Sequence, residues 1–182
     1  MRIIGIDPGS LTTGIGIIEI KNNNAVLVEY DAISMSSKHP LTQRLKKIYD
    51  TCLKKIKKYK PDEFAIETVF YGKNIQSTLK LGQARGVAII AAVNSGIPVS
   101  EYSPREVKKS VTGNGAASKE QVQFMIKSIL AIKENPAFID SSDALAISLC
   151  HFYSLQSKIN KSYNRINNWK EFVDKNPGRV VK

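Results

Sequence analysis

Alternation of apolar and polar side chains dominates the beginning of the chain. Three short runs, at residues 2–7, 13–20 and 25–32, alternate in this way and are rich in isoleucine and valine, which is typical of β-strands. Gly9 lies in the first connection and the polar residues 21–24 form the second. Because both connections are short, the pattern predicts an antiparallel meander of three strands.

A helical period replaces this alternation further along. Apolar residues recur three or four positions apart from Leu45 to Tyr59, and Pro61 follows, so the sequence predicts one amphipathic helix that ends before the proline. The opposite side is basic, with eight lysines and arginines from Arg44 to Lys60. We expect a solvated helical face here rather than a dedicated nucleic-acid site, although it adds to the positive field around the protein.

Strand and helix patterns then alternate. Residues 63–67 and 98–102 form short apolar runs that indicate strands, and residues 75–94 between them predict a long helix that Gly96 and Pro98 end. A mixed five-stranded sheet with helices packed on both faces accounts for this order. The predicted fold class is therefore α/β.

Two capping boxes mark the helices that follow. Ser103 pairs with Glu106, and Ser118 pairs with Gln121, in the spacing that satisfies free N–H groups at the start of a helix. After Pro136, the sequence predicts that the segment of residues 140–156 forms the first part of the last core helix.

Composition limits the class of protein. The chain has 182 residues, of which 42% are hydrophobic and 24% are charged, a balance typical of a folded domain. We expect residues 1–157 to form that domain and the basic residues 158–182 to form a C-terminal tail. No apolar run approaches the roughly 18 residues of a membrane span, and the start MRIIGID lacks a signal-peptide pattern. The prediction is a cytoplasmic protein with no membrane partner.

Four acidic residues stand out in this basic chain. The formal net charge is +11, yet Asp7 ends the first predicted strand, Glu67 ends the fourth, and Asp140 and Asp143 lie three positions apart at the start of the last helix. If the first and fourth strands are neighbours, the four carboxyl groups converge at one edge of the sheet. Like charges held close together raise each other's pKa. A bound divalent cation would remove that conflict.

Carboxylates grouped in this way suit metal-dependent cleavage of a phosphodiester. Two metal ions about 3.5–4 Å apart can activate the water, relieve the charge on the phosphate and stabilise the leaving oxygen. Mg²⁺ prefers oxygen ligands, so we expect two Mg²⁺ ions, with Mn²⁺ as a possible substitute and Asp7 as the bridging ligand. The alternative is that Asp140 and Asp143 only cap a helix and favour its dipole.

Four blocks of sequence resemble the RuvC family of Holliday-junction resolvases. They are DPGxxxTG at 7–14, ETVFYGKNIQSTLKLGQARGVAI at 67–89, EYSPREVKKSVTGNG at 101–115 and DSSDALAIS at 140–148. Their order and spacing also match, and the similarity covers nearly all of residues 1–153.

The resemblance implies a fold, an activity and partners. It implies a ribonuclease-H-like fold, a homodimer, two Mg²⁺ ions per active site, and paired symmetric nicks in four-way junction DNA. A branch-migration helicase complex is a further implied partner. By position, the catalytic acids of the family fall on Asp7, Glu67, Asp140 and Asp143.

Basic and aromatic residues near the acids predict contacts with DNA. Lys108, Lys109 and Lys119 bracket a glycine-rich loop, and lysines of this kind contact phosphates, which position a duplex without reading its sequence.

An aromatic segment follows Glu67. We expect Phe70 and Tyr71, with Lys73 close by, to lie beside the metal ions, where an aromatic ring can stack on an unpaired base. The alternative for these aromatics is a packing role in the core or the loop.

The predicted long helix carries a candidate dimer contact. Gly82 and Gly86 lie four positions apart near two alanines, and small residues of this kind let another helix approach closely. Close packing on the protein's own sheet would explain them equally well, and the resemblance favours a dimer.

Other functions stay open at this stage. The segment DPGSLTTGIGI also resembles the first phosphate loop of actin-like sugar kinases and chaperone ATPases, which need two such domains around the nucleotide. A junction-binding protein without catalysis is a second alternative. A related nuclease that acts on RNA or RNA–DNA hybrids is the third.

Overall fold

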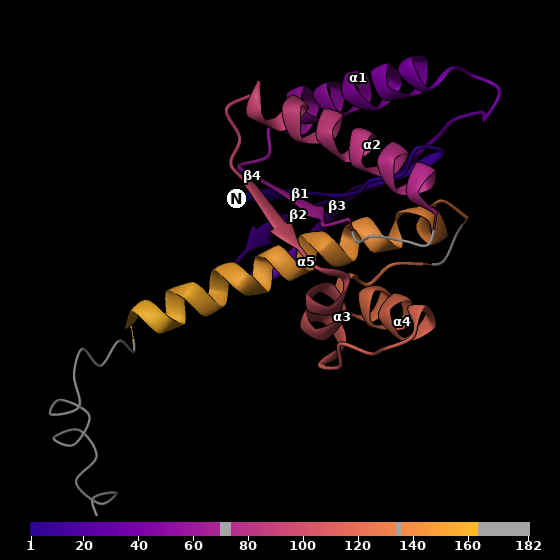
Figure 1. The fold of residues 1–182 in the computed structure, drawn as a ribbon. Coiled ribbons are helices and arrows are strands. Elements are labelled where there is room, and N and C mark those ends of the chain that lie inside the picture. The colour runs from indigo at the N-terminus through magenta and orange to yellow at the C-terminus, as the bar shows by residue number, and fades with distance from the viewer. Residues whose placement is uncertain (70–73, 134–135, 164–182) are drawn as a thin grey trace, which may run out of the picture. The chain divides into compact units, whose positions relative to one another are not determined.

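The computed structural model describes residues 1–69, 74–133 and 136–163 (Figure 1). Within these ranges, the side chains of residues 136–138, 140 and 158–163 lie outside the description. The chain divides into two units, Met1–Phe152 and Tyr153–Lys182. The described residues form the elements β1 (Arg2–Asp7), β2 (Thr12–Lys21), β3 (Asn24–Ser34), α1 (Leu41–Tyr59), β4 (Glu63–Glu67), α2 (Ile75–Val93), β5 (Val99–Tyr102), α3 (Pro104–Thr112), α4 (Lys119–Leu130) and α5 (Pro136–Tyr163).

One mixed sheet forms the centre of the first unit. The strand order is β3-β2-β1-β4-β5. Strands β1, β2 and β3 form the predicted antiparallel meander, whereas β4 pairs in parallel with both β1 and β5. The expectation that the first and fourth strands are neighbours is confirmed, so their carboxyl ends meet at the same edge.

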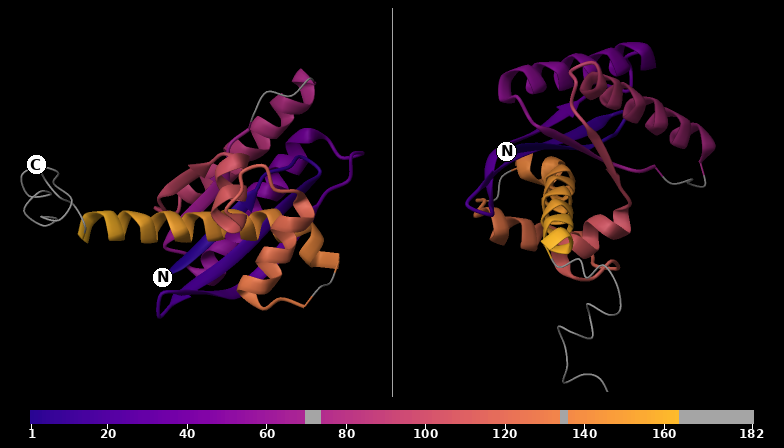
Figure 2. Two further views of the ribbon diagram at one scale, coloured as in Figure 1. Left: turned by 90° about the horizontal axis from the view of Figure 1, so that it is seen from below. Right: turned by 90° about the vertical axis from the view of Figure 1, so that its left-hand side faces the viewer.

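Helices cover both faces of this sheet, as the sequence predicts. Helices α1 and α2 pack against each other on one face, and the first part of α5 lies across the other, beside α3 and α4 (Figures 1 and 2). The boxes at Ser103 and Ser118 cap α3 and α4 through both of their reciprocal hydrogen bonds. None of the helices in the described ranges combines the length and apolar character that crossing a bilayer requires.

Alternation along the strands sorts side chains between the two faces. Ile4, Ile6, Ile15, Ile17 and Phe64 belong to the buried core formed with α1 and α2. Because side chains alternate, the residues between them face α5.

Those intervening residues are small and lie in a row. Gly16 of β2, Gly5 of β1 and Ala65 of β4 are partners in the sheet register. A Cβ at Gly16 would lie 2.7 Å from the Leu145 nitrogen, and one at Gly5 would collide with the Ala144 carbonyl oxygen. The row therefore lets the backbone of α5 approach the sheet closely.

The last helix begins earlier than the sequence pattern indicates. It starts at Pro136, a residue whose fixed φ suits the first turn of a helix, so Asp140 and Asp143 lie beyond that turn. The expectation that they stand at the helix start was wrong. Helix-capping therefore does not explain Asp143.

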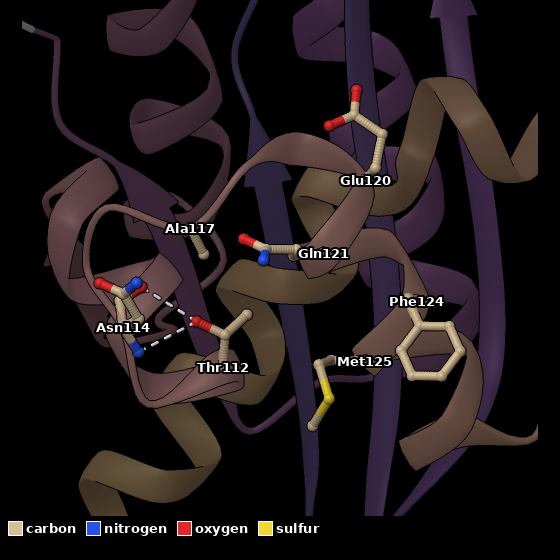
Figure 3. Close-up of a pocket in the computed structure, with 7 residues that line it drawn as sticks. All are labelled: Thr112, Asn114, Ala117, Glu120, Gln121, Phe124 and Met125. Atoms are coloured by element: carbon tan, nitrogen blue, oxygen red, sulfur yellow. Dashed lines mark hydrogen bonds between the residues drawn. The ribbon is translucent and has the colours of Figure 1, made fainter.

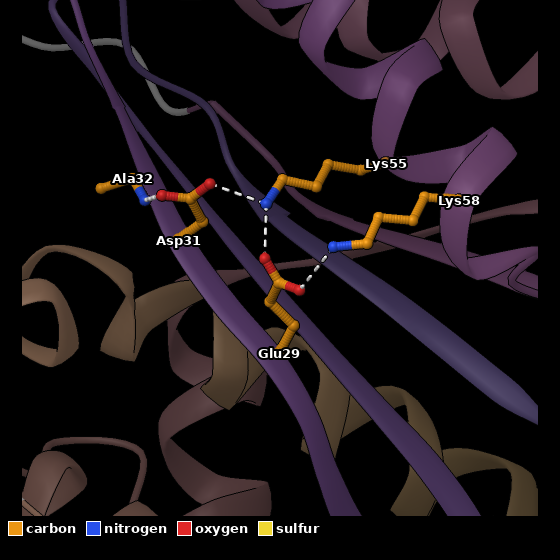
Figure 4. Close-up of polar contacts among 5 residues, drawn as sticks. All are labelled: Glu29, Asp31, Ala32, Lys55 and Lys58. Carbon is orange, nitrogen blue, oxygen red and sulfur yellow. Dashed lines mark hydrogen bonds and ion pairs between the residues drawn. The ribbon is translucent and has the colours of Figure 1, made fainter.

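Two basic residues of α1 are less solvated than expected. Arg44 is 8% exposed, and its Nη1 donates to the Ser10 carbonyl oxygen at 2.7 Å. The Lys55 side chain is 12% exposed, and its Nζ lies 2.7 Å from carboxylate oxygens of both Glu29 and Asp31 (Figure 4). These contacts fasten α1 to the loop after β1 and to the edge strand β3.

Candidate active site

Two of the predicted acids end neighbouring parallel strands. Ile6 of β1 and Ile66 of β4 are partners in the register, and Asp7 and Glu67 are the next residues along. Each acid lies two positions after a small residue that faces α5, so both carboxyl groups project on the α5 side.

Asp143 reaches the same place from α5. It precedes Ala144, whose carbonyl oxygen lies against Gly5. Asp143 also lines a pocket of about 220 Å³ with Glu67, Lys108 and Lys119. The structure thus brings three of the four predicted acids together from segments that are far apart in the sequence. The side chain of Asp140 lies outside the described residues.

The pKa values of Asp7 and Glu67 are both raised at this site. Burial, and then the charge of Asp143, raise the pKa of Asp7 to about 6, although Lys119 acts in the opposite direction. Burial, and then the charges of Asp7 and Asp143, raise the pKa of Glu67 to about 7, against an opposing effect of Lys108. The site is therefore short of positive charge.

Lys119 supplies part of the missing charge. Its Nζ donates to Oδ2 of Asp143 at 2.8 Å. In this arrangement, no three His, Cys, Asp or Glu side chains of the described ranges are grouped closely enough to hold a metal ion. The chemistry of the donor set nevertheless fits a divalent cation, because carboxylate oxygens that repel one another are suitable ligands for Mg²⁺.

The loop after Asp7 is held by contacts that sequence analysis missed. The Thr13 hydroxyl donates to the Gly9 carbonyl oxygen at 2.7 Å and accepts from the Gly9 N–H at 3.3 Å. Arg44 binds the next residue, Ser10. Thr13 and Arg44 gave no sequence signal, because their side chains bind backbone atoms of Gly9 and Ser10. Such contacts do not depend on the type of residue that is bound.

The predicted DNA contacts divide into three groups. Lys108 and Lys119 line the pocket that contains Glu67 and Asp143. Lys109 lines a separate depression with Arg105 and the glycine loop. Phe70, Tyr71 and Lys73 lie outside the described residues, so their predicted roles stay predictions.

A second pocket, of about 550 Å³, is lined by residues of α3, α4 and the loop between them (Figure 3), and its lining includes none of the three acids. Its lining includes Phe124, which is 70% exposed, and a single carboxylate, that of Glu120. Because one carboxylate cannot reproduce the cluster at the sheet edge, we place the candidate active site at Asp7, Glu67 and Asp143.

Comparison with known proteins decides between the functions that the sequence leaves open. Residues 3–151 match the family model described as crossover junction endodeoxyribonuclease RuvC. The chain belongs to the RuvC family. The RuvC proteins of Chloroherpeton thalassium and Salinibacter ruber are each 48% identical to it, with alignments that cover 100% and 99% of both chains.

Solved structures agree with the RuvC assignment. Thermus thermophilus RuvC in complex with a Holliday junction substrate has a TM-score of 0.78 and 34% identity, covering 86% of this chain and 96% of that one. The yeast mitochondrial Holliday junction resolvase Ydc2 has a TM-score of 0.63 at 14% identity, covering 88% and 82%, and supports the fold alone. The predicted ribonuclease-H-like α/β fold is confirmed.

Proposed function

We propose that this chain resolves four-way DNA junctions by paired symmetric nicks that depend on divalent metal ions. The observation that carries the proposal is the cluster of Asp7, Glu67 and Asp143, two of which, Glu67 and Asp143, line a pocket together with two lysines. Membership of the RuvC family supports the same activity.

The acids would hold the metal ions. Asp7, Glu67 and Asp143 are the proposed ligands, with Asp140 as a fourth, and two Mg²⁺ ions are the proposed cofactor, with Mn²⁺ as a substitute. When bound, the ions would activate water and stabilise charge on the scissile phosphate. The rigid ends of β1 and β4 and the closely packed α5 fix where the carboxyl groups stand.

The lysines would hold the DNA backbone. Lys108 and Lys119 lie in the same pocket as Glu67 and Asp143, so a phosphate that reaches these carboxylates also meets two ammonium groups. Lys109 and the aromatic segment with Phe70, Tyr71 and Lys73 are proposed as further contacts. Residues 1–157 would form the nuclease domain and residues 158–182 a basic tail.

An exposed stripe on α2 supports the proposed homodimer. A Cβ added at Gly82 or Gly86 would meet nothing within 4 Å, whereas Ala84 and Ala88 are fully buried. Packing on the protein's own sheet therefore explains the alanines and not the glycines. The same side of the helix exposes four large apolar residues, Ile75, Leu79, Ile90 and Val93.

A two-fold dimer suits the substrate. The stripe is apolar, repeats at helical spacing and is self-complementary when two copies of α2 meet. Two identical active sites would then face equivalent strands of an approximately two-fold junction. A branch-migration helicase as partner, and the cytoplasm as the place of action, stay predictions.

The decisive experiment replaces Asp7 by asparagine. Asp7→Asn removes a negatively charged ligand and leaves the lysines in place, so junction cleavage should be lost while junction binding is kept. Cleavage of a labelled junction with and without Mg²⁺, together with a gel-shift titration, measures both. Nicking by the variant at a rate near that of the wild type would refute the proposed site.

A further inference from the structure

Arg85 of α2 connects three elements at the end of strand β4. Its Nε donates to the backbone carbonyl oxygen of Glu67 at 3.2 Å. Its guanidinium also forms an ion pair with Glu101 of β5, and the arginine side chain is 21% exposed. The Arg85 side chain therefore connects α2 to β4, which carries the candidate metal ligand Glu67, and to β5.

The carbonyl that Arg85 binds belongs to the peptide unit that follows the candidate ligand. The N–H of the same peptide unit, contributed by Thr68, donates to the Tyr102 carbonyl oxygen at 2.9 Å. Both ends of this peptide are thus fixed, one by β5 and the other by α2. Because the orientation of the peptide constrains the backbone dihedrals of Glu67, it also constrains the direction of its Cα–Cβ bond.

We propose that Arg85 is a positioning residue that holds the Glu67 carboxylate in place for metal binding and ties its position to helix α2. The inference rests on the proposed function, because it takes Glu67 as a metal ligand. It extends that function, because α2 also carries the exposed stripe through which a second copy would bind. Contacts between protomers would then reach the metal site through one side chain.

The ion pair with Glu101 has a separate role from the bond to Glu67. The Glu101 side chain is 50% exposed, and partly exposed ion pairs contribute little to stability. Its effect is to orient the guanidinium toward the carbonyl oxygen. Removing Glu101 should therefore weaken the positioning only slightly, whereas removing Arg85 should abolish it.

Metal binding without DNA tests the proposal. We expect Arg85→Gln to bind Mn²⁺ about 10- to 100-fold more weakly than the wild type, the range for groups that orient metal ligands, in titrations followed by electron paramagnetic resonance. Single-turnover cleavage should fall while junction affinity stays unchanged, and a higher Mn²⁺ concentration should restore part of the rate. Glu101→Gln, the matched control, should stay near wild type in metal affinity.

Several outcomes would overturn the proposal. An Arg85→Gln protein with a lower melting temperature but wild-type metal affinity would make Arg85 merely structural. If Glu101→Gln lowers Mn²⁺ affinity as much as Arg85→Gln does, the ion pair, and not the bond to the Glu67 carbonyl oxygen, would account for the effect. If Arg85→Gln does not fold, Arg85→Met replaces it, because methionine has no N–H donor, and unchanged metal affinity there counts against the idea. Wild-type protein that binds no metal would instead refute the proposed function.

Discussion

Asp7 and Glu67 each combine burial with a like-charged neighbour. Their pKa values, raised to about 6 and about 7 from ordinary values of 3.8 and 4.5, mean that the folded protein keeps protons that the unfolded chain releases. Stability must then fall as the pH rises through this interval, because the unfolded state binds fewer protons there. The loss is complete above the folded pKa values.

A pH series on metal-free protein tests this conclusion. The melting temperature, measured by calorimetry, should decrease between about pH 4 and about pH 7 as both carboxyl groups ionise. Saturating Mg²⁺ should remove most of the decrease, since it binds the native state only. Asp7→Asn should flatten the profile of the metal-free protein. A wild-type melting temperature that rises across this interval would contradict the assignment.

Some of the residues at the candidate site could be predicted from the sequence, and others could not. Asp7 and Glu67 were predictable because each is an acidic residue at the end of a strand that the apolar pattern predicts. Arg85 was not, because its role lies in a bond to a backbone atom of a residue eighteen positions away, and no periodicity records such a contact. Arg44 was expected on a solvated helical face for a related reason. Its long side chain instead turns inward and donates to the Ser10 carbonyl oxygen.

At the scale of elements, the row of Gly16, Gly5 and Ala65 decides how near α5 lies to the sheet. The Ser148 hydroxyl, which donates to the Gly16 carbonyl oxygen at 2.9 Å, depends on the same approach. The isoleucine pattern predicted these strands, but it could not indicate that their glycines receive a helix. The reason for these glycines is helix α5, which contacts them and lies more than a hundred residues further along the chain.

Gly16→Ala should therefore be costly. The added methyl group has no room beside Leu145, so we expect a loss of about 1–3 kcal/mol in unfolding free energy, as for overpacked cores, with slower cleavage because Asp143 is displaced. Urea denaturation measures the first effect. Ser148→Ala serves as the control, because it removes a hydroxyl that donates to the Gly16 and Ala144 carbonyl oxygens, a loss of about 1 kcal/mol, without adding bulk. Equal stability of Gly16→Ala and wild type would show that α5 shifts freely.

At the scale of the whole molecule, the described surface has large exposed apolar residues on α2, α4 and α5. Those of α2 form a stripe, whereas Phe124 stands on α4. The glycines of α2 can be found in the sequence, but whether they face a second chain or the protein's own sheet cannot, because exposure depends on how the helix packs.

Leu79→Lys should separate the proposed dimer. Leu79 is 62% exposed in the isolated chain, so the change should leave the fold intact and place a charge in the interface. Sedimentation velocity should show a monomer, and paired nicks should become uncoordinated single nicks. Phe124→Lys, the matched control at 70% exposure, should stay dimeric. A Leu79→Lys protein that remains a dimer would place the interface elsewhere.

The order in which the chain is synthesised has a consequence for the proposed metal site. Asp7 and Glu67 come together when β4 pairs with β1, yet Asp143 arrives only with α5, which follows the other described elements along the chain. Because amino-terminal parts emerge and fold first, a chain still on the ribosome lacks one of the three carboxylates. Under the proposed function, the metal site therefore stays incomplete until residue 143 has emerged from the ribosome and α5 has folded onto the sheet.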